Sequence, residues 1–194
     1  MEKKHKRNSK IYQIFQYFAM LLPYVIIVLV NKDVYFEKTT KITPEYLKEQ
    51  GIENLLLDVD NTLTTHDNPE PTPGIPQWIE EMKANGIGMV IISNNNKERV
   101  EPFAAKLGLP FTSMSCKPLP FKYIKGMKML GGNRKNTAMV GDQIFTDVMG
   151  ANLSGMKCLM VLASLAEESA GFKFKRRIEK GFIEKYLKQQ GGAL

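Results

Sequence analysis

"LLLDVDNTLT", residues 55–64, joins a run of apolar residues directly to two aspartates, Asp58 and Asp60. In a parallel sheet covered by helices, a central strand has apolar side chains on both faces, so residues 55–57 and Val59 indicate such a strand. The two aspartates then follow its carboxyl end. Open α/β sheets bind their ligands at this edge, so the position favours a functional site.

The rest of the chain alternates between strand and helix patterns. We predict strands over 54–59, 88–94, 137–141 and 157–162, and helices over 43–50, 75–85, 97–107, 121–130 and 146–154. Thr43 and Pro44 are typical of the N-cap and the first position of a helix. The alternation predicts an α/β fold with a Rossmann-like, doubly wound parallel sheet. Residues 173–190 resemble a basic amphipathic helix.

The charge is concentrated at the two ends of the chain. Residues 1–10 carry five Lys/Arg and one Glu, and residues 173–194 carry seven Lys/Arg and two Glu, which gives +9 for the ends. The formal net charge is +7, so the part between them carries about −2 (7 − 9). This distribution argues against a nucleic-acid surface, and it favours either an anionic membrane as partner or two solvated charge runs.

An uncharged segment, residues 11–30, follows the basic N-terminus. Its length fits a transmembrane anchor, but Gln13, Gln16 and Pro23 interrupt it, so an interfacial helix and a core helix remain alternatives. We favour peripheral attachment to the inner face of the cell membrane and a cytoplasmic catalytic domain. The predicted division is a membrane-associating extension over residues 1–32 and one globular domain over residues 33–194.

The two cysteines, Cys116 and Cys158, are far apart and form no C-x-x-C motif. This argues against a disulfide framework and a zinc site, and it favours a reducing compartment with buried free thiols. The two histidines, His5 and His66, do not accompany a serine nucleophile, so a catalytic triad is poorly supported.

Polar side chains follow several of the predicted strands. Because the carboxyl ends of parallel strands share one edge, we expect these side chains to converge there. Each motif alone has a simpler explanation as a turn or as the cap of the next helix. A common location for all of them favours a functional site. The candidate residues are Asp58, Asp60, Thr62, Ser93, Asn94, Lys117, Asp142 and Asp147.

Three carboxylates close together repel one another, and a hard dication with oxygen ligands, Mg²⁺, neutralises them best. Lys117 and the Ser93 hydroxyl supply positive charge and a donor for phosphate oxygens. These are the parts that phosphoryl transfer requires. Asp58 is then placed to attack phosphorus as a carboxylate, and Asp60 is placed to protonate the leaving oxygen and later to activate water.

The motifs "DVDNTLT" and "GDQIFTD", with a serine and a lysine between them, resemble the haloacid dehalogenase superfamily of phosphohydrolases over residues 33–190. "SNNNKERV", Lys117-Pro118 and "FKRRIEK" are similar to the YqeG branch, capless enzymes of subclass IIIA related to mitochondrial phosphatidylglycerophosphate phosphatases. The resemblance implies Asp58 as nucleophile and Asp60 as acid and base. It further implies Mg²⁺ on Asp58, Asp142 and the Asp60 carbonyl, phosphate on Ser93 and Lys117, and Asp147 orienting Lys117 or the metal shell.

The loops between the motifs are too short for a large cap domain, so the site is expected to be open. An open site suits a bulky or surface-held substrate, and phosphatidylglycerophosphate is the leading candidate. A soluble nucleotide or sugar phosphate, or a phosphoprotein, is the alternative substrate. A receiver-like phospho-acceptor is disfavoured because Lys117 precedes Asp142, and an inactive scaffold is disfavoured because Asp60 is intact.

Overall fold

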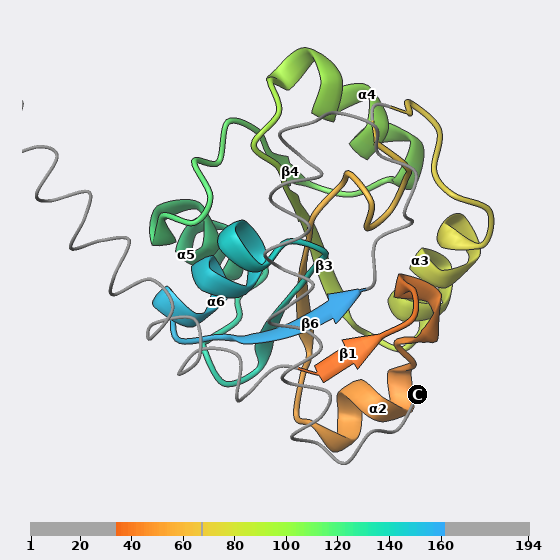
Figure 1. Ribbon diagram of the computed structural model, residues 1–194. Helices are drawn as coiled ribbons and strands as arrows, with labels where there is room; N and C mark the ends of the chain where they lie inside the picture. Colours follow the sequence, from red (N-terminus) through yellow and green to blue (C-terminus); the bar gives the residue numbers. More distant parts are fainter. Residues whose placement is uncertain (1–33, 67, 162–194) are drawn as a thin grey trace, which may run out of the picture.

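Six parallel strands in the order β1-β6-β5-β2-β3-β4 form the centre of the computed structural model, which describes residues 34–66 and 68–161 (Figure 1). Every neighbouring pair in this sheet is parallel. The strands are β1 (Val34–Phe36), β2 (Asn54–Leu57), β3 (Gly88–Ile92), β4 (Phe111–Thr112), β5 (Thr137–Gly141) and β6 (Lys157–Val161). The predicted α/β class with a parallel sheet is confirmed.

Helices connect consecutive strands and cover both faces of the sheet. They are η1 (Thr39–Lys41), α2 (Pro44–Glu49), α3 (Ile75–Ala84), α4 (Lys97–Leu107), α5 (Pro120–Met129), η2 (Ile144–Val148) and α6 (Met149–Leu153). The predicted start of α2 is confirmed, because the Thr43 side chain accepts a hydrogen bond from the Tyr46 backbone N–H at 3.2 Å.

The sheet separates two hydrophobic clusters. Leu55 and Leu57 of β2 belong to the cluster under α3 and α4, whereas Leu56 belongs to the cluster under α5 and α6. All four residues of β2 are buried. This explains why the strand is a continuous apolar run instead of an alternating pattern: helices cover both of its faces.

The chain reverses its direction of winding between β2 and β5, the two central strands. β3 and β4 are added on one side of β2, and β5 and β6 are added on the other side. Leu57 is in register with Val140, so the residues that follow β2 and β5 emerge side by side. Such a reversal leaves a crevice at the carboxyl ends of the strands, where α/β proteins bind ligands.

Two strands and one turn differ from the sequence-based expectation. β1 and β4 were not predicted, because strands of three and two residues are too short to show a period. The helix predicted from residue 146 instead begins at Ile144 with one π-helical turn, η2, and continues as α6. A π turn carries one extra residue, and such turns occur often at functional sites.

The loops 58–74 and 113–119, as far as the structure describes them, contain no helix and no strand beyond a bridge between Asp60 and Thr64. The predicted membrane-associating segment 1–32 and the helix predicted over residues 173–190 lie outside the described residues. Within the described residues, every helix is too short or too polar to cross a membrane.

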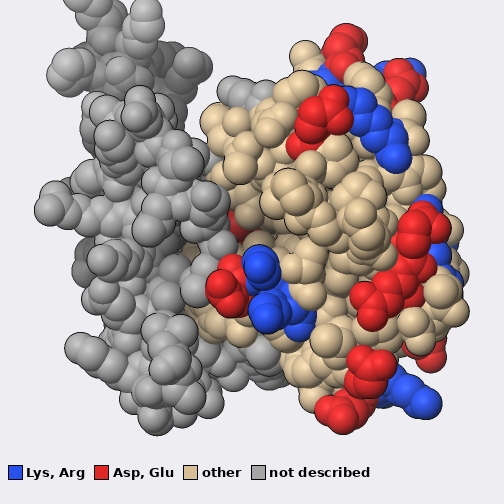
Figure 2. Space-filling view, turned by 90° about the vertical axis from the view of Figure 1, so that its right-hand side faces the viewer, with Lys and Arg blue, Asp and Glu red and all other residues tan. Residues whose placement is uncertain are grey.

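Two exposed ion pairs on the α3 side of the molecule lie within single helices, α3 and α4. Lys83 of α3 contacts Glu80 at 2.8 Å, and Lys97 of α4 contacts Glu101 at 3.3 Å. On this face, groups of both signs lie close to one another around an uncharged centre (Figure 2). Exposed pairs of this kind contribute about 0 to 1 kcal/mol each, so the hydrophobic clusters and not the surface charges stabilise this side.

Candidate active site

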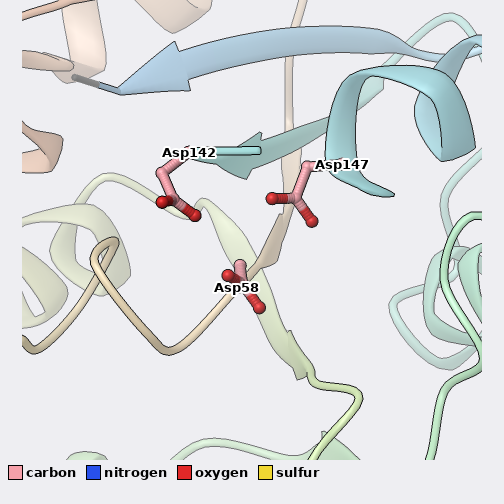
Figure 3. Close-up of side chains that lie close together, drawn as sticks. All are labelled: Asp58, Asp142 and Asp147. Atoms are coloured by element: carbon pink, nitrogen blue, oxygen red, sulfur yellow. The ribbon is translucent and has the colours of Figure 1, made fainter. Parts of the chain in front are cut away.

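Three buried aspartates meet at the carboxyl ends of β2 and β5. Asp58 follows β2, Asp142 follows β5, and Asp147 lies in η2. One carboxylate oxygen of each lies within 4.8 Å of the others, and the three groups face a common centre (Figure 3). Asp142 and Asp147 are fully buried, and Asp58 is 5% exposed. The predicted convergence of the two motifs is therefore seen in the structure.

Lys117 lies among these carboxylates. Its Nζ is 2.5 Å from Asp58 Oδ1 and 2.7 Å from Asp147 Oδ1, and its side chain is 3% exposed. Asp147 Oδ2 accepts a hydrogen bond from the Gln143 backbone N–H at 3.1 Å. Asp147 thus holds Lys117 against Asp58. Two roles were predicted for Asp147, orienting Lys117 or orienting the metal shell, and this contact fits the first. Charge-assisted bonds in a buried site are strong and fix the geometry.

Burial sets the electrostatics of this cluster. Burial raises the pKa of Asp58 to about 7, because removing the carboxylate from water outweighs the attraction of Lys117, which lowers the pKa. Repulsion between the carboxylates of Asp147 and Asp58 raises the pKa further. Burial alone would lower the pKa of Lys117, but Asp147 and Asp58 outweigh it and hold the pKa above its ordinary value. Lys117 is therefore a permanent cation, whereas Asp58 is easily protonated when no further cation is present.

The loop that carries Lys117 is fixed to the end of β3. The Lys117 backbone N–H donates to Asn94 Oδ1 at 2.7 Å, and Asn94 Nδ2 donates to the Lys117 carbonyl at 3.3 Å. Met114 and Cys116 adopt positive φ angles of 45° and 54°, and the Lys117–Pro118 peptide bond is cis. In this structure Asn94 therefore holds the backbone of Lys117 in place. From the sequence we had instead predicted that Asn94 binds the substrate directly.

Ser93 and Thr62 border the same end of the sheet, and both are buried. Ser93 Oγ accepts a hydrogen bond from the Asn95 backbone N–H at 3.2 Å. Thr62 Oγ1 is buried and has no hydrogen-bond partner among the described residues, while the Thr62 carbonyl accepts from Thr39 Oγ1 at 2.6 Å. Their predicted contacts with phosphate remain predictions.

The side chain of Asp60 contacts two residues near the start of α4, Asn95 and Arg99. Its Oδ2 accepts from Asn95 Nδ2 at 2.6 Å, and its Oδ1 lies 2.5 Å from Arg99 Nη2. The side chain of Asp60 is 14% exposed, so it is more accessible than Asp58. The two aspartates of the D-x-D motif therefore have different surroundings, as the two predicted roles require.

Asp147 is positioned by close packing. A Cβ atom on Gly141 would lie 2.4 Å from Asp147 Cγ, so only glycine leaves room for this carboxylate beside β5. The buried Tyr123 of α5 donates from its hydroxyl to the Thr146 carbonyl in η2 at 2.9 Å. A Cβ atom on Gly150 would lie 2.3 Å from the same tyrosine. Gly141 and Tyr123 thus support η2. Gly141 begins the predicted motif "GDQIFTD" but was assigned no role from the sequence, and Tyr123 was not singled out.

The donor set fits a divalent cation. Three carboxylates and one ammonium carry a formal charge of −2 (−3 + 1) in a space from which water is largely excluded. Buried charge of this size is costly unless it is neutralised. All the available donors are oxygens, which Mg²⁺ prefers over softer metals. Asp147 belongs to this group of carboxylates, although it was not among the predicted metal ligands. The predicted ligand of Asp60 was its backbone carbonyl, and its side chain contacts Asn95 and Arg99.

Sequence reasoning missed two residues that contact the predicted site, Asn95 and Arg99. Both belong to the stretch "SNNNKERV", yet composition and spacing gave no reason to assign them a role. The sequence signal for Arg99 was its place in the first turn of α4, shortly after the four polar residues 93–96 that follow β3.

Comparisons with known proteins agree with this geometry. A model of the haloacid dehalogenase-like hydrolase family matches residues 4–155. The probable phosphatase YqeG of Bacillus subtilis is 34% identical over 159 residues, which cover 82% of this chain and 92% of that protein. The chloroplastic/mitochondrial phosphatidylglycerophosphate phosphatase 1 of Arabidopsis thaliana is 26% identical over 155 residues, 75% of this chain and 44% of that protein.

Among solved structures, NagD from E. coli aligns with a TM-score of 0.50 and 12% identity, covering 60% of this chain and 90% of NagD, which supports the fold alone. The family match covers well over half of the chain, and the YqeG similarity extends over most of both proteins. The predicted resemblance to the YqeG branch is confirmed, and the chain belongs to the haloacid dehalogenase-like hydrolases.

Proposed function

We propose that this hydrolase is a Mg²⁺-dependent phosphomonoesterase that works through a phosphorylated Asp58. The observation that carries the proposal is the buried contact of Asp58 with Lys117 at 2.5 Å beside Asp142 and Asp147. The predicted enzyme class, a phosphatase of the haloacid dehalogenase type, is confirmed by the family match and by the similarity to YqeG. The residue roles and the substrate given below are proposals.

The reaction has two half-reactions. A carboxylate oxygen of Asp58 attacks phosphorus, the bond between phosphorus and the ester oxygen breaks, and Asp60 gives its proton to the departing alkoxide. Water then attacks the phosphorus of the aspartyl-phosphate, and Asp60 takes a proton from it. The bond between phosphorus and Asp58 breaks, so inorganic phosphate leaves and both aspartates return to their first state.

Lys117 has two tasks in this scheme. It holds Asp58 in one orientation, and its ammonium group lies close enough to offset negative charge on the transferring phosphoryl group. The Ser93 hydroxyl and Thr62 lie at the same edge of the sheet and are the proposed donors to the remaining phosphate oxygens. Asn94 is a proposed donor only through its second side-chain N–H, because the first donates to the Lys117 carbonyl. Thr62 Oγ1 has no hydrogen-bond partner among the described residues, which makes it available for this task.

Asp58 and Asp142 are the proposed carboxylate ligands of Mg²⁺, with the Asp60 carbonyl as a third oxygen. When bound, the ion offsets the charge of these carboxylates and of the phosphate oxygens. Asp147 lies within the same 4.8 Å group but is bonded to Lys117 and to the Gln143 N–H. We assign it to orienting the lysine.

We propose a lipid phosphate, phosphatidylglycerophosphate, as the substrate. The similarity to the Arabidopsis enzyme of that name supports this choice, as do the loops 58–74 and 113–119 beside the site, which contain no cap domain as far as the structure describes them. Apolar side chains lie exposed next to Lys117 in the sequence: Met114 is 67%, Leu119 is 49% and Phe121 is 72% exposed. Exposed apolar groups next to a polar site are expected where a protein meets a membrane surface.

Basic residues accompany these apolar side chains. Helix α5 carries Lys122, Lys125 and Lys128 and no acidic residue. An anionic bilayer attracts lysines by about 1 kcal/mol each near its surface. Together with the predicted extension over residues 1–32, this surface supports peripheral attachment of the enzyme to the inner face of the cell membrane.

The substrate proposal is tested with the full-length protein and Mg²⁺ by measuring phosphate release. Phosphatidylglycerophosphate in mixed vesicles is compared with glycerol phosphate, a nucleotide monophosphate, a sugar phosphate and a phosphopeptide. We expect kcat/KM for the lipid to exceed that for each soluble ester by at least about tenfold, because a surface-held substrate is concentrated at the site. A soluble ester hydrolysed faster than the lipid would contradict the proposal.

A matched pair of variants separates membrane contact from chemistry. Phe121→Ser should lower hydrolysis of the lipid in vesicles and leave glycerol phosphate hydrolysis unchanged. Leu153→Ser, which changes an apolar side chain of α6 that is 54% exposed, should alter neither reaction. Equal losses on both substrates in Phe121→Ser would show that this side chain supports the fold and not the membrane contact.

A further inference from the structure

Both carboxylate oxygens of Asp60 are held by side chains from one short segment. Asn95 Nδ2 donates to Oδ2 at 2.6 Å, and Arg99 Nη2 lies 2.5 Å from Oδ1. Asn95 lies between β3 and α4, and Arg99 lies in the first turn of α4. A carboxylate bound at both oxygens by two donors from different directions has little rotational freedom.

The three consecutive asparagines after Ser93 have different partners. Asn94 binds the backbone of Lys117 through both its amide groups. Asn95 binds Asp60. Asn96 is the N-cap of α4, and its Oδ1 accepts from the Arg99 backbone N–H at 3.1 Å. One tripeptide therefore fixes the lysine loop, the second aspartate of the D-x-D motif and the helix turn that carries Arg99.

We propose that Arg99 and Asn95 are positioning residues that hold Asp60 in place for proton transfer, an inference that rests on the proposed phosphatase function. Asp60 must face the ester oxygen in the first half-reaction and a water molecule in the second. A carboxyl group that turns freely reaches these positions only part of the time. A misplacement of about 1 Å costs on the order of 100-fold in rate at such sites.

The proposal distinguishes between substrates by their leaving groups. An alkoxide is a poor leaving group and needs a proton from Asp60 as the bond to phosphorus breaks. A nitrophenolate leaves readily without one. Loss of the Asp60 orientation should therefore slow alkyl phosphates far more than aryl phosphates, because general acid catalysis contributes only where the leaving oxygen requires a proton.

The experiment measures kcat/KM for glycerol phosphate and for p-nitrophenyl phosphate with the full-length protein and Mg²⁺. This ratio reports the steps up to phosphorylation of Asp58, so the second half-reaction does not enter it. In Arg99→Gln we expect a loss on the order of 10- to 100-fold for glycerol phosphate and less than about threefold for p-nitrophenyl phosphate. Asn95→Ala should show the same selectivity with a smaller loss.

Controls separate positioning from folding. Lys97→Gln removes an exposed charge two residues from Arg99 in the same helix, and it should change neither rate. Arg99→Lys keeps one donor and should recover part of the lost rate on glycerol phosphate. The thermal stabilisation by Mg²⁺ should be the same in Arg99→Gln and in the wild type, because Arg99 contacts the side chain of Asp60, which is not one of the proposed carboxylate ligands of the metal.

Each outcome decides the proposal. Selective loss on glycerol phosphate in both Arg99→Gln and Asn95→Ala supports it. Equal losses on the two substrates, or no loss in either variant, would overturn it and leave the phosphatase function standing. If the wild type hydrolyses neither ester nor the lipid, the proposed function is wrong, and the inference about Arg99 and Asn95 is wrong with it.

Discussion

The two ends of the central strands both carry buried polar residues, but of opposite kinds. At the carboxyl end lie the charged groups Asp58, Lys117, Asp142 and Asp147, here called the carboxyl-end cluster. At the amino end lie Asn54 and Thr137, which are neutral and buried. They begin β2 and β5, and they are neighbours in the register of the sheet.

Hydrogen bonds within the fold hold the amino end together, and Thr137 Oγ1 donates to Asn136 Oδ1 at 3.5 Å. The Asn136 carbonyl accepts from the backbone N–H groups of Glu53 and Asn54 at 2.9 and 3.0 Å. The Asn136 side chain donates to Glu53 Oε2 at 2.6 Å and accepts from the Asn133 N–H at 2.7 Å. Close packing completes this end, because a Cβ atom on Gly88 would lie 2.5 Å from Asn54 Oδ1.

The difference shows which end is built for stability and which for chemistry. Hydrogen bonds between neutral groups contribute roughly 1 kcal/mol each and need no ligand. Three buried carboxylates around one lysine repel one another, and they lower stability until a cation binds. A chain retains such an arrangement where the activity requires it, so destabilisation is expected at functional sites.

The largest effect is expected at the carboxyl-end cluster. Asp58→Asn removes the proposed nucleophile while it keeps the size of the side chain. We expect Mg²⁺-dependent hydrolysis of p-nitrophenyl phosphate to fall by roughly four orders of magnitude or more, because an amide does not form the phosphorylated intermediate. Steady-state rates measured beside those of the wild type check this.

A matched control for that variant lies at the amino end. Glu53→Gln removes one exposed carboxylate next to β2, so the same type of change is made at the other end of the same strand. Its hydrolysis rate should stay within about twofold of the wild type, as for a surface change remote from the site. Full activity in Asp58→Asn would refute the proposed mechanism.

A smaller effect is expected on stability, measured by Tm. Mg²⁺ at about 100 times its Kd should stabilise the wild type by about 2.7 kcal/mol, or roughly 5 to 10 °C. Asp142→Asn removes a proposed ligand, so the stabilisation by Mg²⁺ should be mostly lost. Glu53→Gln should keep it in full. An unchanged Mg²⁺ response in Asp142→Asn would exclude this aspartate as a ligand.

Stability without metal should also depend on pH. Burial raises the pKa of Asp58 from 3.8 in the unfolded chain to about 7. Between these values the native state binds a proton that the unfolded chain has released, so stability falls as pH rises from about 4 to about 7. We therefore expect Tm in EDTA to decrease from pH 5 to pH 8. The decrease should be smaller in Asp58→Asn, which lacks this titration, and an equal decrease would contradict the assignment.

The smallest effect is expected at the amino end. Asn133 Oδ1 accepts from the Lys135 N–H at 2.8 Å and forms the turn that leads into β5. Asn133→Ala should lower the free energy of unfolding by about 1 kcal/mol, the contribution of a local turn bond. Chemical denaturation measures this loss, and the rate on p-nitrophenyl phosphate should not change. A large loss of activity would show that the two ends are coupled.

Much of the fold was predictable because its signals are local. The run 88–92 is apolar over a whole strand length, and in the run 137–141 only the first residue, Thr137, is polar. Glycines such as Gly108 end the helices between them. The predicted boundaries differ from the observed ones by at most two residues for most elements. β1 and β4 were missed because two or three residues contain no period, and only pairing with a neighbouring strand makes them strands.

The candidate site was predictable in part. That Asp58, Lys117 and Asp142 would lie together followed from the rule that parallel strands share a carboxyl edge. The loop geometry at Lys117 did not follow, because Met114 and Cys116 adopt positive φ angles that favour glycine elsewhere. The buried thiol of Cys158 was predicted correctly, whereas Cys116 is exposed.

The sequence by itself determined the order of the elements, the edge at which the polar groups gather and the family to which the chain belongs. These features were readable because apolar periods and short motifs involve residues close together in the chain. Only the tertiary structure decided that Asp147, which was expected at this edge, binds Lys117, and that Asp60 binds Asn95 and Arg99. Side-chain direction depends on packing between segments 30 to 60 residues apart, and no local pattern encodes it.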